Sequence, residues 1–292
     1  MENTPAIIFE DNHIIVVIKP QGMPSQPDAS GDLDMLTMLK QYRTENENKP
    51  GEAFLGLVHR LDRVTGGVMV FAKTSKSAKR LSLQIQAGSD GHPEYGTFSK
   101  KYLAIIHGTP KQPQGRLEHY LLKDDKLNKV AVVGAATSGA KRAELTYKVM
   151  HSINIEHIGR PKVAPTQDID KKSYTDEILS PFESQNKSEN KAENLSLVQI
   201  NLLTGRSHQI RIQFATIGNP LVNDHKYNSS LFRVGFALGE PLDKNLCLWS
   251  YQLSFNHPTS GELLKFIVNP PETHPWEMFD FARKDHKTQA LS

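Results

Sequence analysis

The stretch Leu57–Lys73 (LVHRLDRVTGGVMVFAK) constrains the fold of this chain more than any other. A polar run that contains two arginines and an aspartate is followed by Val68–Ala72, which is apolar without interruption. An apolar run of this length is typical of a strand that is buried on both faces. The turn Thr65-Gly66-Gly67 before it has little side-chain bulk, so another backbone or a ligand can approach closely. The stretch therefore predicts a rigid polar loop in front of a buried strand.

Asp62 is the residue of this loop that is best suited to chemistry. It lies between Arg60 and Arg63, and a carboxylate beside guanidinium groups stays ionised. An ionised carboxylate that is held rigidly can act as a nucleophile or as a general base. A surface ion-pair cluster at a strand end would have the same residues, and for an isolated Arg-Leu-Asp-Arg this second interpretation is the commoner one.

The composition places the chain among ordinary globular proteins. Of its 292 residues, 38% are hydrophobic and 23% are charged, and the net charge of +3 permits a nucleic-acid partner without requiring one. The single cysteine, Cys247, excludes a disulfide framework and a paired-cysteine metal site, which fits a reducing cytoplasm. The first residues lack the pattern of a signal peptide, and no window of about 18 residues is apolar throughout, so we expect no membrane segment.

Periodicity predicts strands alternating with a few helices. The expected strands are Ile7–Glu10 and Ile14–Lys19 as a hairpin, Phe98–His107, an antiparallel meander of Arg116–Leu122, Lys129–Val133 and Ala143–Met150, then Leu195–Leu203, Cys247–Phe255 and Leu263–Val268. The expected helices are Asp34–Arg43, Ser75–Gln86 with Ser75 as N-cap, one beginning near Arg206–Ser207 with Ile210, Phe214 and Ile217 facing the core, and a closing helix Glu272–Arg283.

We expect a single domain over residues 1–292. Residues 157–194 are rich in Lys, Asp, Glu, Asn and Ser, which is typical of a mobile polar insertion, and residues 284–292 are expected to form a frayed tail.

Several ordered motifs resemble the RluA-type pseudouridine synthases, and together they cover about residues 6 to 275. His59–Lys73 is similar to the signature of that family, with Gly66 where Ser or Thr is usual. Thr204–Arg211 (TGRSHQIR) resembles its Thr-Gly-Arg-x-His-Gln-Ile-Arg element closely. Lys19-Pro20-Gln21-Gly22, the Lys-x-Tyr of residues 100–102 and Asn219–Tyr227 also resemble family elements; in the last, Asn223 replaces a glycine and is expected to keep the left-handed turn.

The resemblance implies an α+β pseudouridine synthase fold, a largely antiparallel mixed sheet around a central cleft with flanking helices. It makes Asp62 the catalytic residue, pairs Arg211 with it and places Tyr102 against the uracil. Arg63 would fill the gap that an extruded base leaves, while His59 and Arg60 would orient the loop. The other expected substrate-binding residues are Leu61, Thr65, Gly67, Arg206, His208 and Ile210.

The implied reaction is the isomerisation of a uridine in rRNA or tRNA to pseudouridine, and it requires no cofactor and no metal. The expected enzyme is an RNA-binding cytoplasmic monomer without the N-terminal S4 module of many relatives, and it would take the uridine flipped into its cleft. Asp62 could attack covalently or remove a ribose proton, and the sequence does not distinguish the two. Two alternatives stay open: a non-catalytic RNA-binding module, and a glycosidic hydrolase with Asp224 as its second carboxylate.

Overall fold

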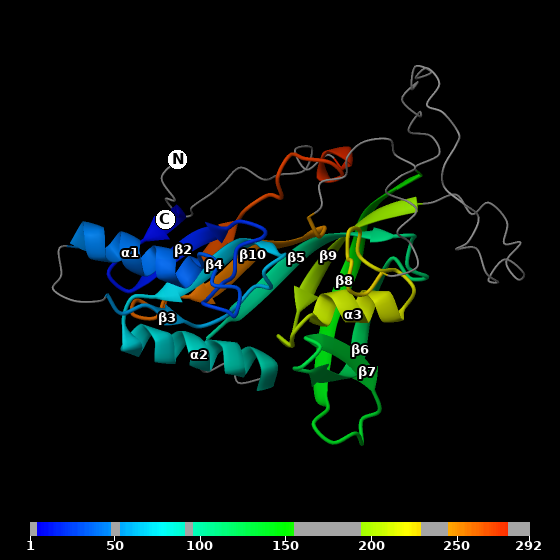
Figure 1. The fold of residues 1–292 in the computed structure, drawn as a ribbon, viewed down its shortest axis with the longest axis horizontal. Coiled ribbons are helices and arrows are strands. Elements are labelled where there is room, and N and C mark those ends of the chain that lie inside the picture. The colour runs from blue at the N-terminus through cyan, green and yellow to red at the C-terminus, as the bar shows by residue number, and fades with distance from the viewer. Residues whose placement is uncertain (1–4, 48–52, 91–95, 155–193, 229–244, 280–292) are drawn as a thin grey trace, which may run out of the picture.

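The computed structural model describes residues 5–47, 53–90, 96–154, 194–228 and 245–279 (Figure 1). Their strands form one eleven-stranded sheet. The strands are β1 Ala6–Glu10, β2 Ile14–Lys19, β3 Gly56–Leu57, β4 Gly66–Ala72, β5 Phe98–His107, β6 Gln114–Asp124, β7 Lys129–Val133, β8 Lys141–Asn154, β9 Asn194–Leu202, β10 Leu248–Asn256 and β11 Leu263–Ile267. The helices are α1 Met35–Glu47, α2 Ser75–Asp90, α3 Gln209–Thr216 and the 3-10 helix Trp276–Met278.

The strand order is β1-β2-β4-β10-β5-β9-β8-β6-β7, with β3 on β4 and β11 on β10. β4 and β10 run parallel, and every other strand pair in the described part of the chain is antiparallel. In Figure 1, α1 and α2 lie at the end of the sheet that holds β2–β4, and α3 lies against β6–β8. The predicted α+β architecture with a largely antiparallel mixed sheet is confirmed.

The meander predicted for β6, β7 and β8 has the wrong order. A meander would place β7 in the middle, whereas β6 pairs with β7 on one edge and with β8 on the other. β8 also pairs with β9 along Leu145–Asn154, which makes it the link to the rest of the sheet. Alternation along each strand predicted the strands but carries no information on which neighbour each one takes.

α1 and α2 run past their predicted ends, to Glu47 and Asp90. The cap of α2 also differs from the prediction. Ser75 is its first helical residue, and the amide of Ser77 donates to Oγ1 of Thr74 at 3.1 Å. Thr74 is therefore the capping residue.

α3 begins at Gln209, later than the predicted start near Arg206–Ser207. His208 precedes it in the left-handed conformation, with φ of 50°, and the side chain of Gln209 accepts from the amide of Arg206 at 3.0 Å. This turn delays the helix. Ile210 and Phe214 are buried as expected, but Ile217 lies beyond the helix end and is exposed.

The closing helix predicted for Glu272–Arg283 is wrong over residues 272–279, which the structure describes. The 3-10 helix Trp276–Met278 stands in its place, because Pro275 disfavours a helical conformation of the residue before it. Residues 280–283 of that prediction, the tail 284–292 and the polar segment 157–194 apart from Asn194, which begins β9, lie outside the described residues.

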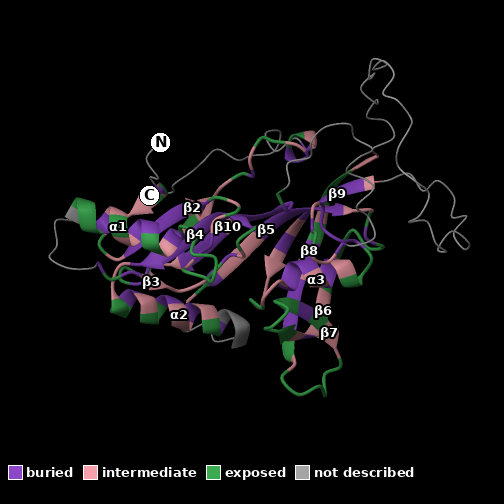
Figure 2. Cartoon of the chain, viewed as in Figure 1, coloured by how far each residue is buried: buried purple, intermediate pink, exposed green. Residues whose placement is uncertain are grey.

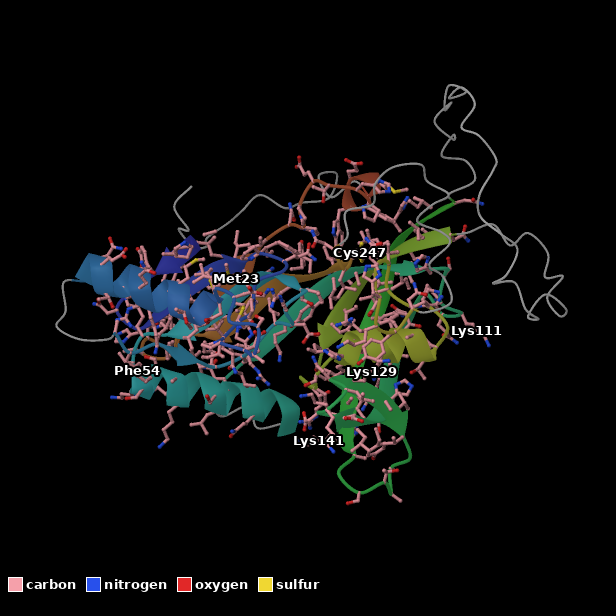
Figure 3. The ribbon with its side chains drawn as sticks, in the orientation of Figure 1. Met23, Phe54, Lys111, Lys129, Lys141 and Cys247 are labelled. Carbon is pink, nitrogen blue, oxygen red and sulfur yellow. The ribbon has the colours of Figure 1, made fainter. Side chains whose placement is uncertain are left out.

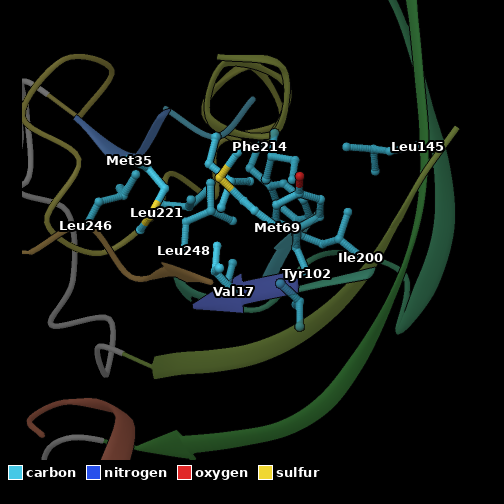
Figure 4. Close-up of a cluster of buried hydrophobic side chains, with 14 of the residues drawn as sticks. Val17, Met35, Met69, Tyr102, Leu145, Ile200, Phe214, Leu221, Leu246 and Leu248 are labelled. Carbon is cyan, nitrogen blue, oxygen red and sulfur yellow. The ribbon is translucent and has the colours of Figure 1, made fainter. Parts of the chain in front are cut away.

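The strands β2 and β4 are buried almost throughout, in agreement with the apolar run that predicted β4 (Figure 2). A core cluster on one face of the sheet joins Met69, Tyr102 and Ile200 of three strands to Phe214 of α3. Figure 4 shows Phe214 beneath α3, with Tyr102 nearer the strands. In the described residues, no helix has the length and hydropathy needed to cross a membrane.

Candidate active site

The loop that carries Asp62 connects β3 to β4 and is closed by a turn in which the amide of Thr65 donates to the carbonyl of Asp62 at 2.9 Å. Gly67 follows, with φ of 116°. A side chain there would start 2.3 Å from the carbonyl oxygen of Ser250, because β10 runs beside β4 at this position. The close approach of a second backbone, expected from the glycine pair, is therefore confirmed: the β10 backbone at Ser250 lies against Gly67.

Lys19 and Ser25 fix the backbone of the same loop through hydrogen bonds. The Lys19 ammonium is fully buried and donates to the carbonyls of Pro20 at 2.8 Å, Met23 at 2.6 Å and Arg63 at 3.2 Å. The hydroxyl of Ser25 donates to the carbonyl of Leu61 at 2.8 Å. Burial lowers the pKa of Lys19 to about 7, against the opposing effect of the Asp62 charge. The backbone on both sides of Asp62 is thus fixed.

Arg211 faces Asp62 as expected, with Nη1 3.7 Å from Oδ2. Its tight partner, however, is Asp224. Nε donates to Oδ2 of Asp224 at 2.8 Å and Nη2 to Oδ1 at 2.7 Å, and the Asp224 side chain is fully buried. The sequence predicted Asp62 as the partner of Arg211, but the bidentate pair is formed with Asp224, and Arg211 lies between two carboxylates.

His208 is the second group that faces Asp62, with Nε2 3.9 Å from Oδ2. Its Nδ1 lies 2.7 Å from the hydroxyl of Tyr227, which accepts from the amide of Val130 at 2.9 Å. Because the hydroxyl oxygen already accepts from that amide, its O–H can donate a hydrogen bond to Nδ1. Nδ1 is then the acceptor, so the neutral His208 ring carries its proton on Nε2. Burial lowers the pKa of His208 despite the nearby Asp62 charge, so a neutral ring is favoured near pH 7.

Tyr102 is almost completely buried and lines the same cleft. Burial and then the charge of Asp62 raise the pKa of its phenol, so the phenol stays protonated. The ring also contacts the core cluster beneath α3. Tyr102 can therefore present a rigid, neutral ring to a planar ligand next to Asp62.

The cleft has a volume of about 1400 Å³, more than the roughly 300–1000 Å³ of a small-molecule site. Among the residues that the structure describes, eight lysines and arginines line it, against two aspartates. Lys129 of β7, labelled in Figure 3, is one of these cations. A wide, positively charged groove suits a polyanion rather than a small neutral ligand.

The remaining predicted site residues fall into two groups. Those that line the cleft are His59, Arg60, Leu61, Arg63, Thr65, Arg206, His208 and Ile210, whereas Gly67 lies in β4 beside Ser250 of the neighbouring strand β10. Arg60 is exposed, and Arg63 is paired with Asp32 and donates to Ser30 at 2.9 Å. His59 is tied to the strand, since the amide of Val70 donates to its Nε2 at 3.1 Å. Asn223 has φ of 61°, which confirms the left-handed turn expected where the family has glycine.

The sequence alone did not indicate the roles of Lys19, Ser25 and Tyr227, and Asp224 was expected only as a second carboxylate of a hydrolase. Lys19, Asp224 and Tyr227 stand in segments that resemble family elements, which was the available signal. No group of three or more His, Cys, Asp or Glu side chains in the described ranges is arranged to hold a metal ion.

Residues 13–216 match the family described as RNA pseudouridylate synthase. The chain belongs to this family. As an RNA pseudouridine synthase it is an isomerase that acts on RNA, and the basic cleft around Asp62 agrees with such a substrate.

Similar proteins carry related names. A protein of Aquifex aeolicus named "Uncharacterized RNA pseudouridine synthase" is 28% identical over 277 residues, which cover 93% of this chain and 72% of that protein. "Ribosomal large subunit pseudouridine synthase D" of Pseudomonas aeruginosa is 29% identical over 295 residues, covering 96% and 72%. "Ribosomal large subunit pseudouridine synthase C" of Haemophilus influenzae is 25% identical over 260 residues, covering 89% and 63%.

The pseudouridine synthase fold is also supported by solved structures. "Human RNA Pseudouridylate Synthase Domain Containing 4" superimposes with a TM-score of 0.60 at 22% identity, covering 91% of this chain and 88% of that one. At this identity the likeness concerns the fold alone.

Proposed function

We propose that this pseudouridine synthase isomerises a uridine of large-subunit ribosomal RNA and that Asp62 is its catalytic carboxylate. The observation that carries the proposal is the position of Asp62. It lies in a basic cleft on a backbone fixed by Lys19 and Ser25, and it faces Arg211 and His208. The ribosomal target is supported by the names of the Pseudomonas and Haemophilus relatives.

In this proposal the uridine leaves its stack and enters the cleft, with the uracil against Tyr102. Asp62 either attacks the nucleoside covalently or removes a ribose proton as the N1–C1′ bond breaks. The uracil turns in place and C5 joins C1′, so no group enters or leaves. Arg211 is shared between Asp62 and Asp224, so it orients Asp62 without being its exclusive counter-ion. The other cleft-lining residues bind the RNA around the uridine.

A glycosidic hydrolase would need a second available carboxylate. Asp224 was the candidate, but it is buried and both of its oxygens accept from Arg211. A non-catalytic RNA-binding module would not need a carboxylate held between Arg211 and His208 in the cleft. The site therefore favours the isomerase.

The test is Asp62→Asn, which keeps the shape of the side chain and removes the charge. We expect complete loss of tritium release from 5-tritiated RNA, with an unchanged unfolding midpoint and nearly unchanged RNA affinity. Retained turnover would remove Asp62 from the mechanism. Release of free uracil by the unaltered enzyme would instead identify a hydrolase.

The target is tested by mapping pseudouridines in total RNA from a deletion strain. Loss of one site in large-subunit rRNA is expected, whereas a lost tRNA site would contradict the ribosomal target. We also propose a cytoplasmic monomer. The described residues of this chain already form the cleft around Asp62, and the one cysteine, Cys247, is buried and takes part in no disulfide among them. Sedimentation of the purified protein and cell fractionation test these two points.

A further inference from the structure

Lys100 is a cation without a counter-ion in the wall of the cleft. It is partly buried, and burial lowers its pKa. No hydrogen bond or ion pair joins its ammonium to any residue that the structure describes. Of the other seven cleft cations, Arg63, Lys123 and Arg211 have a carboxylate partner and Arg206 and Lys226 donate to backbone carbonyls, whereas Arg60 and Lys129 are exposed to water. An ammonium that is partly withdrawn from water and unpaired is unfavourable, and an anion bound beside it would relieve that penalty.

His59 supplies a second unsatisfied donor to the same wall. Its Nε2 accepts from the amide of Val70, so the proton of the neutral ring is on Nδ1. That Nδ1 is buried and has no hydrogen-bond partner among the described residues. Burial, and then the charge of Lys100, lower the pKa of His59 to about 3, so the ring is neutral at pH 7. Both side chains line the cleft.

Gly205 leaves room at the Lys100 ammonium. A β-carbon at this position would lie 3.2 Å from Nζ, which is tighter than ordinary van der Waals contact. Gly205 also lines the cleft, at the start of the segment that leads to His208 and Arg211. Because Gly205 has no side chain, the Lys100 ammonium is not blocked on the side that faces Gly205.

We propose that Lys100 forms a subsite for one phosphate of the RNA backbone beside the target uridine, with His59 in the same wall of the cleft. The proposal rests on the proposed role of the Asp62 cleft. Lys100 and Tyr102 are two residues apart on β5, so their side chains leave the same face about 7 Å apart. One sugar-phosphate unit can bridge a base on Tyr102 and an anion at Lys100.

The chain offers a matched control in Lys101, which follows Lys100 on β5 and points to the opposite face of the sheet. The experiment compares Lys100→Met, Lys100→Arg and Lys101→Met. It measures the dissociation constant of a single-stranded oligouridylate over a series of salt concentrations. Lys100→Met should weaken binding roughly tenfold. It should also reduce the slope of log affinity against log salt by about 0.7, the value for one phosphate contact with a single strand.

Lys100→Arg should keep the wild-type slope, because it keeps the charge, and Lys101→Met should keep both slope and affinity. Equal behaviour of Lys100→Met and Lys101→Met, whether both lose affinity or neither does, would overturn the subsite. Unfolding midpoints show whether each variant is folded. Because the readout is binding, a protein that failed the tritium-release test would still report on the subsite, so the two failures are distinguishable.

Discussion

Arg211 binds Asp224 through Nε and Nη2, at 2.8 and 2.7 Å, and turns its remaining nitrogen toward Asp62 at 3.7 Å. The two carboxylates differ in their surroundings, since Asp224 is fully buried whereas the Asp62 side chain is 31% exposed. Asp224 therefore fixes the guanidinium, and Asp62 remains open to a ligand. This relationship makes Asp224 a positioning residue for the proposed reaction.

Asp224→Asn should lower both stability and turnover, because it leaves the Arg211 charge buried with no bidentate partner. We expect a loss of about 3 kcal/mol in the free energy of unfolding. The turnover number should fall about 100-fold, the effect of a misplacement of about 1 Å at a reacting group. Urea unfolding and tritium release measure the two quantities. Asp125→Asn, in an exposed pair with Lys123, is the control and should change neither. Wild-type turnover in Asp224→Asn would show that Arg211 needs no such orientation.

Tyr227→Phe should raise the pKa of His208 toward its ordinary value. The hydroxyl that stabilises the neutral ring through Nδ1 is removed, so protonation becomes easier. The amide of Val130 also loses its acceptor, which should lower the free energy of unfolding by about 1 kcal/mol. NMR titration of the His208 ring measures the pKa. Tyr120→Phe, on β6, is the matched control, and an unchanged His208 titration in Tyr227→Phe would contradict the assigned proton position.

Lys19→Met should change the pH dependence of stability. The folded-state pKa of Lys19 is about 7, below the 10.5 of the unfolded chain. Between these values the unfolded chain binds one proton more, so the free energy of unfolding should rise with pH by up to about 1.4 kcal/mol per unit. Lys19→Met should lose this rise while Lys126→Met, on the surface, keeps it. Urea unfolding between about pH 7 and pH 9 tests the prediction, and parallel profiles for the two variants would refute it.

Arg63→Ala should impair the enzyme on structured RNA more than on a single strand. If Arg63 replaces the extruded base in the stack, the variant loses that contact only where a stack must be opened. A roughly tenfold fall in kcat/KM on structured RNA is expected, with little change on an oligonucleotide. Asp32→Asn releases Arg63 from an exposed pair and should leave both activities intact. Unchanged affinity and turnover in Arg63→Ala on both substrates would end this role.

The sequence by itself determined the parts that depend on neighbours in the chain. The unbroken apolar run predicted β4, and alternation predicted β5 and β7 with the bounds that the structure has. The motif order pointed to Asp62 and Arg211, and the tolerance of Asn for the left-handed conformation predicted the turn at Asn223.

Only the tertiary structure decided which groups meet. In the folded chain β6 lies between β7 and β8, and Arg211 forms its ion pair with Asp224. Lys19 is buried beneath the Asp62 loop, where it donates to the carbonyl of Arg63. In each case the local sequence pattern is equally compatible with several neighbouring strands or side-chain partners. The choice follows from the packing of strands and helices that are distant in the chain, and local periodicity and motif spacing carry no information on that packing.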